Sequence, residues 1–245
     1  MFGIGTLVNT ALVFLGGILG LLLKKGLSEK IQSTLISACG VASAFIGISG
    51  TVSGMLTYGE GKFGTKGAML LIFSLVIGGF FGEIIDIEKR MDSLGEKLKN
   101  KFGSENDGRF VEGFVTASLI MCVGAMTIVG GIQDGMVGGL KGASMLIAKG
   151  VLDFVMACIL ASTCGVGVLC SAGVVLVYQG AIALAAHFAG NFFSENLISN
   201  ITYVGSALIF GVGINLIFGK KIKVGNLLPA LLVPCVYELI LCFAE

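Results

Sequence analysis

Long apolar stretches without charges dominate this sequence, and they limit its fold more than any other feature. From Phe154 to Ala186, for example, the chain contains no Asp, Glu, Lys or Arg. A helix needs about 20 consecutive apolar residues to cross a lipid bilayer. Dividing the chain on this basis predicts about eight spans. Their approximate bounds are 4–23, 32–57, 66–87, 111–133, 142–162, 172–190, 200–218 and 226–243.

The composition excludes a water-soluble globule. Only 13% of the residues are charged and 55% are hydrophobic, whereas a soluble domain carries about 25% charged residues. We therefore predict an all-α fold, a polytopic transmembrane helical bundle that forms a single domain over residues 1–245. The first apolar stretch is preceded by no Lys or Arg. A cleaved signal peptide has a basic segment there, so we interpret this stretch as a retained first span.

The boundary between the fifth and sixth spans is the least clear. We place it at Thr163-Cys164-Gly165-Val166-Gly167, because two glycines within five residues loosen a helix. A loop would explain this pattern, and so would a re-entrant turn that is buried within the protein.

Basic residues predict the orientation of the spans. Twelve of the 16 Lys and Arg residues fall in three loops, at 24–30, 89–109 and 220–223. Eight spans place these three loops on one side of the membrane, whereas seven would move one of them to the other side. Basic loops stay in the cytoplasm, so both termini are expected outside.

The longest loop, at about 88–110, carries its own pattern. Its apolar residues recur every three or four positions, with charged residues between them. This predicts an amphipathic helix on the cytoplasmic face of the membrane, and a solvated linker with chance periodicity is the alternative. The apolar positions are Ile87, Met91, Leu94, Leu98 and Phe102.

Two short similarities within the chain raise the hypothesis of an internal repeat. Residues 11–25 match residues 207–221 at seven of fifteen positions, and Lys66-Gly67-Ala68 recurs as Lys141-Gly142-Ala143. Secondary transporters commonly contain such repeats, but apolar helices also match one another by chance.

Glycines spaced four residues apart recur within the predicted spans. In a bilayer, small residues allow helix backbones to approach closely. These positions therefore predict tight helix contacts and favour a homo-oligomer through glycine-rich faces. The pairs are Gly16/Gly20, Gly50/Gly54, Gly78/Gly82 and Gly131/Gly135.

Lys149 and Asp153, in the fifth span, form the clearest candidate binding site. Ionisable residues within a membrane are costly and commonly functional. The two residues are four positions apart, so they share one helix face and can neutralise each other. Such a pair could bind an ion, carry a proton or open to a charged substrate. Alternatively, it only fixes helix packing.

Other polar residues are candidates for lining a path. Glu83 ends the third span as a gate or ion ligand, and Glu238 follows two prolines in the eighth; either carboxylate could instead lie in solvent at the interface. Asn9, Gln179 and Asn215 could line the path or form ordinary hydrogen bonds between helices.

Several classes of function are not expected. The chain has no GxSxG, HExxH or P-loop motif, and its one histidine, His187, is the only base for a Ser–His pair. Seven cysteines without a CxxC motif and one histidine do not favour a metal site, haem or any other cofactor. A net charge of +1 does not favour nucleic acid as a partner.

Five segments, in order along the chain, resemble the YdfK/YqgA-like family of bacterial inner-membrane proteins, domain of unknown function 554. They are GTLVN at 5–9, GGILG at 16–20, GEIIDIEKR at 82–90, LIAKGVLDF at 146–154 and NLLPALL at 226–232. The resemblance covers nearly the whole chain and implies a multi-pass protein of the bacterial plasma membrane. The family is often described loosely as a putative transporter, and the resemblance supplies no substrate.

Together these observations favour a transporter or channel for a small solute or ion, without its own ATPase. Its partners would be the lipid bilayer and the transported solute or ion. The alternative is a membrane scaffold or regulatory protein that does not transport, with the amphipathic loop as its docking element.

Overall fold

Nearly every apolar stretch forms a helix, because lipid offers the backbone no hydrogen bonds and a helix satisfies them internally. The computed structural model describes residues 3–24, 28–59, 62–102, 109–123, 125–189 and 194–244. Its helices are α1 (Ile4–Lys24), α2 (Glu29–Met55), α3 (Ala68–Ile85), α4 (Ile87–Phe102), α5 (Phe110–Val123), α6 (Ala125–Met136), α7 (Gly139–Cys164), α8 (Gly167–Ala189), α9 (Glu195–Phe218), α10 (Val224–Leu227), the short 3₁₀ helix η2 (Leu228–Leu232) and α11 (Val233–Ala244).

The predicted helical membrane bundle is confirmed, with differences in detail. Within the described residues, α1, α2, α3, α7, α8 and α9 are each long and apolar enough to cross a membrane alone. The boundary between the fifth and sixth predicted spans is a short turn, since α7 ends at Cys164 and α8 begins at Gly167. Gly165 in this turn has a φ of 86°, a conformation that favours glycine. A loop, rather than a re-entrant segment, therefore connects the two spans.

The fourth and eighth predicted spans are broken. The fourth consists of α5 and α6. Only together are these two helices long and apolar enough to cross a membrane, and they are bent by 60° relative to each other. The eighth consists of α10, η2 and α11. Pro229 and Pro234 explain the second break, because proline cannot donate the backbone hydrogen bond that continues a helix. The count of eight spans is thus approximate.

A short β-hairpin was missed by the sequence analysis. Strands β1 (Leu56–Gly59) and β2 (Lys62–Thr65) are antiparallel and follow α2 directly. The rings of Tyr58 and Phe63 lie opposite each other across the hairpin, with centroids 5.2 Å apart. Four-residue strands give too little alternation of polar and apolar residues to separate them from the end of a helix.

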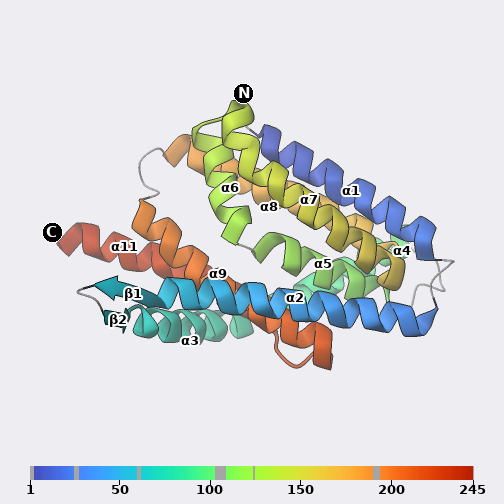
Figure 1. Cartoon of the computed structure of the whole chain (residues 1–245), viewed down its shortest axis with the longest axis horizontal. Helices are drawn as coiled ribbons and strands as arrows, with labels where there is room; N and C mark the ends of the chain where they lie inside the picture. Colours follow the sequence, from blue (N-terminus) through green and yellow to red (C-terminus); the bar gives the residue numbers. More distant parts are fainter. Residues whose placement is uncertain are drawn as a thin grey trace.

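Two helix pairs make the most extensive contacts, and Figure 1 shows α1 alongside α7 and α2 alongside α9. Helices α1 and α7 run parallel, since Gly5 contacts Leu146, Gly16 contacts Phe154 and Gly20 contacts Cys158. Helices α6 and α8 pack beside this first pair. We call these four helices the α1/α6/α7/α8 group.

The glycine pairs predicted from sequence lie at helix contacts within the chain. A Cβ atom at Gly20 would lie 2.2 Å from the backbone oxygen of Cys158, so only glycine permits this approach. Of the remaining pairs, Gly50/Gly54 faces α9, Gly78/Gly82 faces the α10–η2 segment and Gly131/Gly135 faces α8. A homo-oligomer through glycine-rich faces stays a prediction.

Helix α4 occupies the position of the predicted amphipathic loop, up to Phe102. Residues 103–108 lie outside the described part of the chain. Met91 and Leu98 pack against the core, whereas Leu94 is exposed. Figure 1 shows α4 towards the opposite end of the molecule from the hairpin and the C terminus. The position of α4 relative to a membrane stays a prediction.

We predict that Gly20→Ala destabilises the protein by about 1–3 kcal/mol, the usual effect of overpacking a filled interface. Thermal unfolding of the detergent-solubilised protein would measure this. Gly173→Ala is the matched control, because a Cβ atom at Gly173 has no heavy atom within 4 Å. Equal melting temperatures for Gly20→Ala and the wild type would contradict the close α1–α7 contact.

Candidate functional site

Lys149 and Asp153 form a buried ion pair in the middle of α7. Asp153 is the fifteenth of 26 residues in this helix, about 21 Å from its start at 1.5 Å per residue. The exposed fractions of the two side chains are 6% and 8%, and the ammonium of Lys149 contacts Oδ2 of Asp153 directly. A charged pair therefore lies near the centre of a membrane span, shielded from lipid and from water.

Asn9 of α1 is a neutral polar group close to the ion pair. Gly150 makes this possible, because a Cβ atom at Gly150 would lie 3.3 Å from Oδ1 of Asn9. The Asn9 side chain is completely buried and close enough to interact with the Asp153 carboxylate. Neither its nitrogen nor its oxygen, however, makes a hydrogen bond of normal geometry. The site therefore contains an amide with unused donors and acceptors.

Cys122 and Tyr178 complete the surroundings of the ion pair. Cys122, near the end of α5, is close enough to interact electrostatically with both Lys149 and Asp153. Tyr178 of α8 is close to Cys122 in turn. Sequence reasoning missed both residues, because a lone cysteine or tyrosine in an apolar helix has no distinguishing pattern. Residues of α1 and α5 thus lie beside the charged pair of α7, and Tyr178 of α8 lies next to one of them.

Gln179 follows Tyr178 on α8 and is also fully buried. Both of its side-chain polar atoms lack a hydrogen-bond partner. Its backbone oxygen faces Gly131 of α6, 3.8 Å from where a Cβ atom at Gly131 would lie. The structure therefore places Gln179 at the contact between α6 and α8, and its role in lining a path stays a prediction.

The other predicted site residues lie away from the ion pair. Asn215 closes the turn after α9: its Nδ2 donates to the oxygen of Ile222 at 2.7 Å, and its Oδ1 accepts from two backbone N–H groups. Glu238 of α11 accepts a hydrogen bond of 2.7 Å from Ser194, the N-cap of α9. Both side chains hold helix ends in place, and their roles in binding stay predictions.

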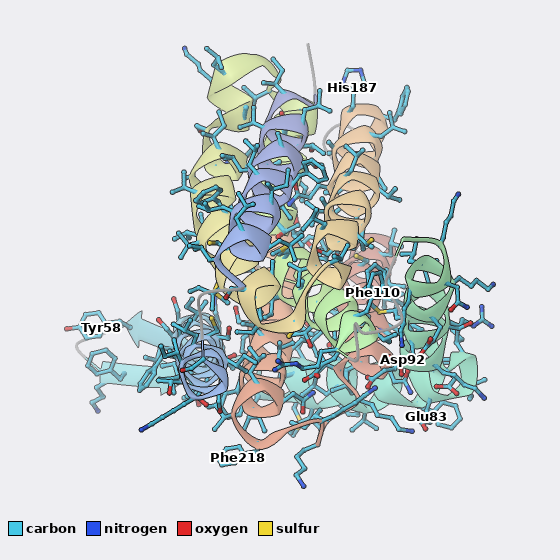
Figure 2. All side chains as sticks on the ribbon, turned by 90° about the vertical axis from the view of Figure 1, so that its right-hand side faces the viewer. Tyr58, Glu83, Asp92, Phe110, His187 and Phe218 are labelled. Atoms are coloured by element: carbon cyan, nitrogen blue, oxygen red, sulfur yellow. The ribbon has the colours of Figure 1, made fainter. Side chains whose placement is uncertain are left out.

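Glu83 belongs to a polar cluster at the end of α3. Nδ2 of Asn226 donates to Oε2 of Glu83 at 2.7 Å, while Oδ1 of Asn226 accepts from the backbone of Glu88 at 2.7 Å. Lys220 pairs with Glu88 at 2.8 Å, and Lys223 pairs with Glu83 at 2.5 Å. The cluster therefore locks the start of α10 to the junction between α3 and α4. Figure 2 shows Glu83 and Asp92 on the same side of the molecule, far from His187 at the tip of α8.

Two lysines of this cluster have raised pKa values. Partial burial lowers the pKa of Lys220, but the hydrogen bonds and charges of Glu88 and Asp92 outweigh this and raise it overall. The hydrogen bond and charge of Glu83 raise the pKa of Lys223. Both lysines therefore stay charged at neutral pH, and the cluster persists there.

The segments that carry the family resemblance meet in space at these two places. GTLVN and GGILG of α1 contact LIAKGVLDF of α7 around the ion pair, through Gly5, Gly16 and Gly150. GEIIDIEKR contacts the start of NLLPALL, where a Cβ atom at Gly82 would lie 1.7 Å from the oxygen of Asn226. The likeness in sequence thus concentrates at a charged centre and at the lock between α3 and α10.

Asp134 of α6 is a third buried charge. It is completely buried and accepts hydrogen bonds from the backbones of Gly5 and Thr6, at 3.0 and 2.9 Å, and from the Thr6 hydroxyl at 3.1 Å. These groups form the first turn of α1, whose N–H groups and dipole favour a negative charge. Asp134 therefore anchors the start of α1 to the broken span.

Two cavities lie at opposite ends of the molecule. One, of about 400 Å³, is lined by Glu88, Asp92, Glu96 and Glu112 and by Lys220. The other, of about 870 Å³, lies between the starts of α3 and α9 and the side of α11. Neither is lined by Lys149 or Asp153. The charged pair is therefore closed off from both cavities in this conformation.

We predict that replacing one residue of the ion pair destabilises the protein far more than replacing both. Lys149→Met leaves the Asp153 charge buried and unpaired, which costs about 3–5 kcal/mol. Combining it with Asp153→Leu should restore most of that loss, because apolar residues replace a buried pair at little cost. Thermal unfolding of the four proteins of this double-mutant cycle would measure the coupling.

Lys141→Met, at an exposed position near the start of α7, is the control for that cycle. If Lys149→Met cost no more stability than Lys141→Met, the pair would not be buried as the structure has it.

Comparison with known proteins agrees with the resemblance seen in the sequence. The family model described as "Protein of unknown function (DUF554)" matches residues 4–239. The uncharacterized membrane protein YdfK of Bacillus subtilis (strain 168) is 36% identical over 230 residues, which cover 94% of this chain and 93% of YdfK. The uncharacterized protein YqgA of Escherichia coli (strain K12) is 31% identical over 233 residues, again 94% of this chain and 93% of the relative. No solved structure gives a match. This helical membrane protein therefore belongs to the DUF554 family.

Proposed function

We propose that this protein is a transporter or channel for a small solute or ion, without its own ATPase, with Lys149 and Asp153 at its central site. One observation carries the proposal. A charged pair lies near the middle of a span, beside an Asn9 amide that is buried, close to Asp153 and makes no hydrogen bond of normal geometry.

A purely structural pair explains this arrangement less well. Well-packed apolar residues stabilise a protein as much as a buried ion pair does, or more. A buried polar group without a partner costs a further 1–3 kcal/mol, roughly. If these residues served only to pack the helices, apolar residues in place of the ion pair and of Asn9 would make the protein more stable. A ligand that pairs with the charged and amide groups explains why they are present.

The broken spans support the same proposal. Transporters bind substrates and ions near the bilayer midplane at helices that are interrupted there. Cys122, beside the ion pair, lies at the end of α5, where the fourth span is bent by 60°. The charged centre thus adjoins an interrupted span.

The proposed setting is the inner membrane of a bacterium, with the basic loops in the cytoplasm and both termini outside. Contacts between Lys220 or Lys223 and the α3–α4 junction bring two of the basic loops together. Ile36, close to the first basic loop, lines the same cavity as Glu88 and Lys220. This grouping supports a common side for the three loops, which the excess of Lys and Arg assigns to the cytoplasm.

A scaffold or regulatory protein that does not transport is the second candidate. Helix α4 supports it, because Leu94 and most of its charged residues are exposed while the helix is held firmly at Glu88. A partner protein could dock on such a surface. Under this alternative the Lys149–Asp153 pair would only fix helix packing.

Ligand-dependent stability distinguishes the two candidates. We expect Na⁺, K⁺, H⁺ or a member of a panel of small anions and metabolites to stabilise the purified wild type. At about 100 times its Kd, a ligand that binds only the folded state adds about 2.7 kcal/mol. Asp153→Asn should abolish this gain, whereas Lys141→Gln, an exposed change on the same helix, should keep it.

Because Asp153→Asn leaves Lys149 unpaired, the combined Lys149→Gln and Asp153→Asn variant serves as a second protein without the charged site. If no ligand stabilises the wild type more than these variants, the transporter proposal fails in favour of the scaffold.

A further inference from the structure

The Lys149 ammonium occupies the place that a bound cation would take. It sits directly on the Asp153 carboxylate, and both side chains are almost fully buried. In hydrocarbon, an unbalanced charge is much more costly than a neutral pair. The pair can exist there because its net charge is zero. Any other state of the same site has to meet the same condition.

Charge balance then limits what can bind. If a monovalent cation joined the site while Lys149 kept its proton, the centre would carry a net charge of +1. If Lys149 gives up that proton, the cation replaces it on Asp153 and the centre is neutral again. A lysine ammonium can lose its proton in this way when buried, whereas an arginine guanidinium cannot.

We propose that Asp153 binds a small monovalent cation in exchange for the proton of Lys149, so that the protein exchanges such cations for protons. The N–H bond of Lys149 breaks, its electron pair stays on the nitrogen, and the proton leaves towards water. The cation pairs with the carboxylate, so one positive charge enters for each one that leaves. This inference rests on the transporter proposal and adds its substrate class and its coupling.

Asn9 has the chemistry that this exchange requires. Its amide lies close to Asp153, and its oxygen and nitrogen are both buried and make no hydrogen bond of normal geometry. The oxygen is a hard ligand of the kind that small cations prefer, and it supplements the carboxylate. The amide N–H can donate to the neutral amine that Lys149 becomes. One side chain therefore offers a group for each product of the exchange, its oxygen for the cation and its N–H for the amine.

A divalent cation fits less well. Its second charge would leave the centre at +1 even after Lys149 had lost its proton. Among the described residues, no group of three or more His, Cys, Asp or Glu side chains could hold a metal ion. The site therefore favours an alkali cation such as Na⁺ or K⁺.

The neighbouring helices present few other groups that could titrate. Helix α5 presents the Cys122 thiol, and Tyr178 of α8 is close to that thiol. On α6, Asp134 is bound to the first turn of α1. On α2, Cys39 lies close to Cys164 of α7. Among the described residues around the pair, Lys149 is thus the proton donor in contact with Asp153, and Cys122 is the rival that a test has to exclude.

Liposomes containing the purified protein and a trapped pH-sensitive dye would test the exchange. A gradient of Na⁺ or K⁺ should drive protons in the opposite direction, one for each cation. An imposed membrane potential should not change the rate, because the exchange moves no net charge. Empty liposomes measure the leak.

Three variants separate the roles of the residues. Lys149→Arg preserves an ion pair with Asp153 but cannot release a proton, so its exchange should fall to the rate of empty liposomes. Lys141→Gln should exchange like the wild type, and Cys122→Ala should still move protons against the cation gradient, because the thiol is not their source. Thermal unfolding shows whether the arginine variant is folded.

A second measurement does not depend on any variant. Addition of NaCl or KCl to the detergent-solubilised wild type in weak buffer should release up to one proton per protein, with choline chloride as the control. Release of no proton by either salt would overturn the inference, as would exchange by Lys149→Arg at the wild-type rate.

Failure of this inference can be told apart from failure of the transporter proposal. Uptake of radioactive Na⁺, Rb⁺ or another solute that needs Asp153 but moves no proton would overturn the inference of proton exchange and leave the transporter proposal standing. Wild-type uptake by Asp153→Asn would overturn the central site as well.

Discussion

The contact between α1 and α7 holds the candidate site together. The two helices run parallel, and their backbones approach so closely that a single methyl group at Gly16 or Gly20 would collide with the opposite backbone. Gly150 extends the same contact and brings Asn9 against the helix that carries Lys149 and Asp153. In lipid, where no hydrophobic force drives helices together, such close backbone packing is the main source of association. The glycines that stabilise the bundle are therefore also the residues that assemble its polar centre.

Polar residues within this protein fall into two kinds. Asn215, Asn226 and Asp134 each use their side-chain atoms to bind backbone or charged groups at helix ends. Asn9 and Gln179 are completely buried, yet their side-chain atoms make no hydrogen bonds of normal geometry. Buried polar groups are nearly always paired in folded proteins. The difference therefore separates groups that hold the structure from groups that are free to receive something.

Much of this architecture could be predicted from the sequence. Apolar length located the spans, and the spacing of Lys149 and Asp153 placed them on one helix face, because both signals are local and depend on helix geometry alone. Pairs of glycines four residues apart located the tight contacts, but this spacing did not indicate which helix lies opposite each pair. The bend between α5 and α6 was missed because the residues there are as apolar as those of an unbroken helix.

The candidate site was predictable only in part, for the same reason. The ion pair lies within one helix, whereas Asn9 and Cys122 approach it from two others, and nothing in their local sequence indicates that meeting. Asn215 was expected to line a path, yet its amide closes a turn with Ile222, seven residues away. From sequence, a polar residue that binds backbone looks the same as one that faces a path.

The hydrogen bonds from α1 to Asp134 also order the assembly of the protein. They join residues that are 128 and 129 positions apart, and the other main partner of α1, helix α7, is made later still. At a synthesis rate of about 5–20 residues per second, the first helix waits on the order of ten seconds or more before its permanent neighbours leave the ribosome. During that time the bilayer or an accessory protein has to accommodate the Asn9 side chain and the N–H groups of the first turn of α1, which are not yet bound to Asp134. Helix α1 thus meets its partners only after more than a hundred further residues have been made.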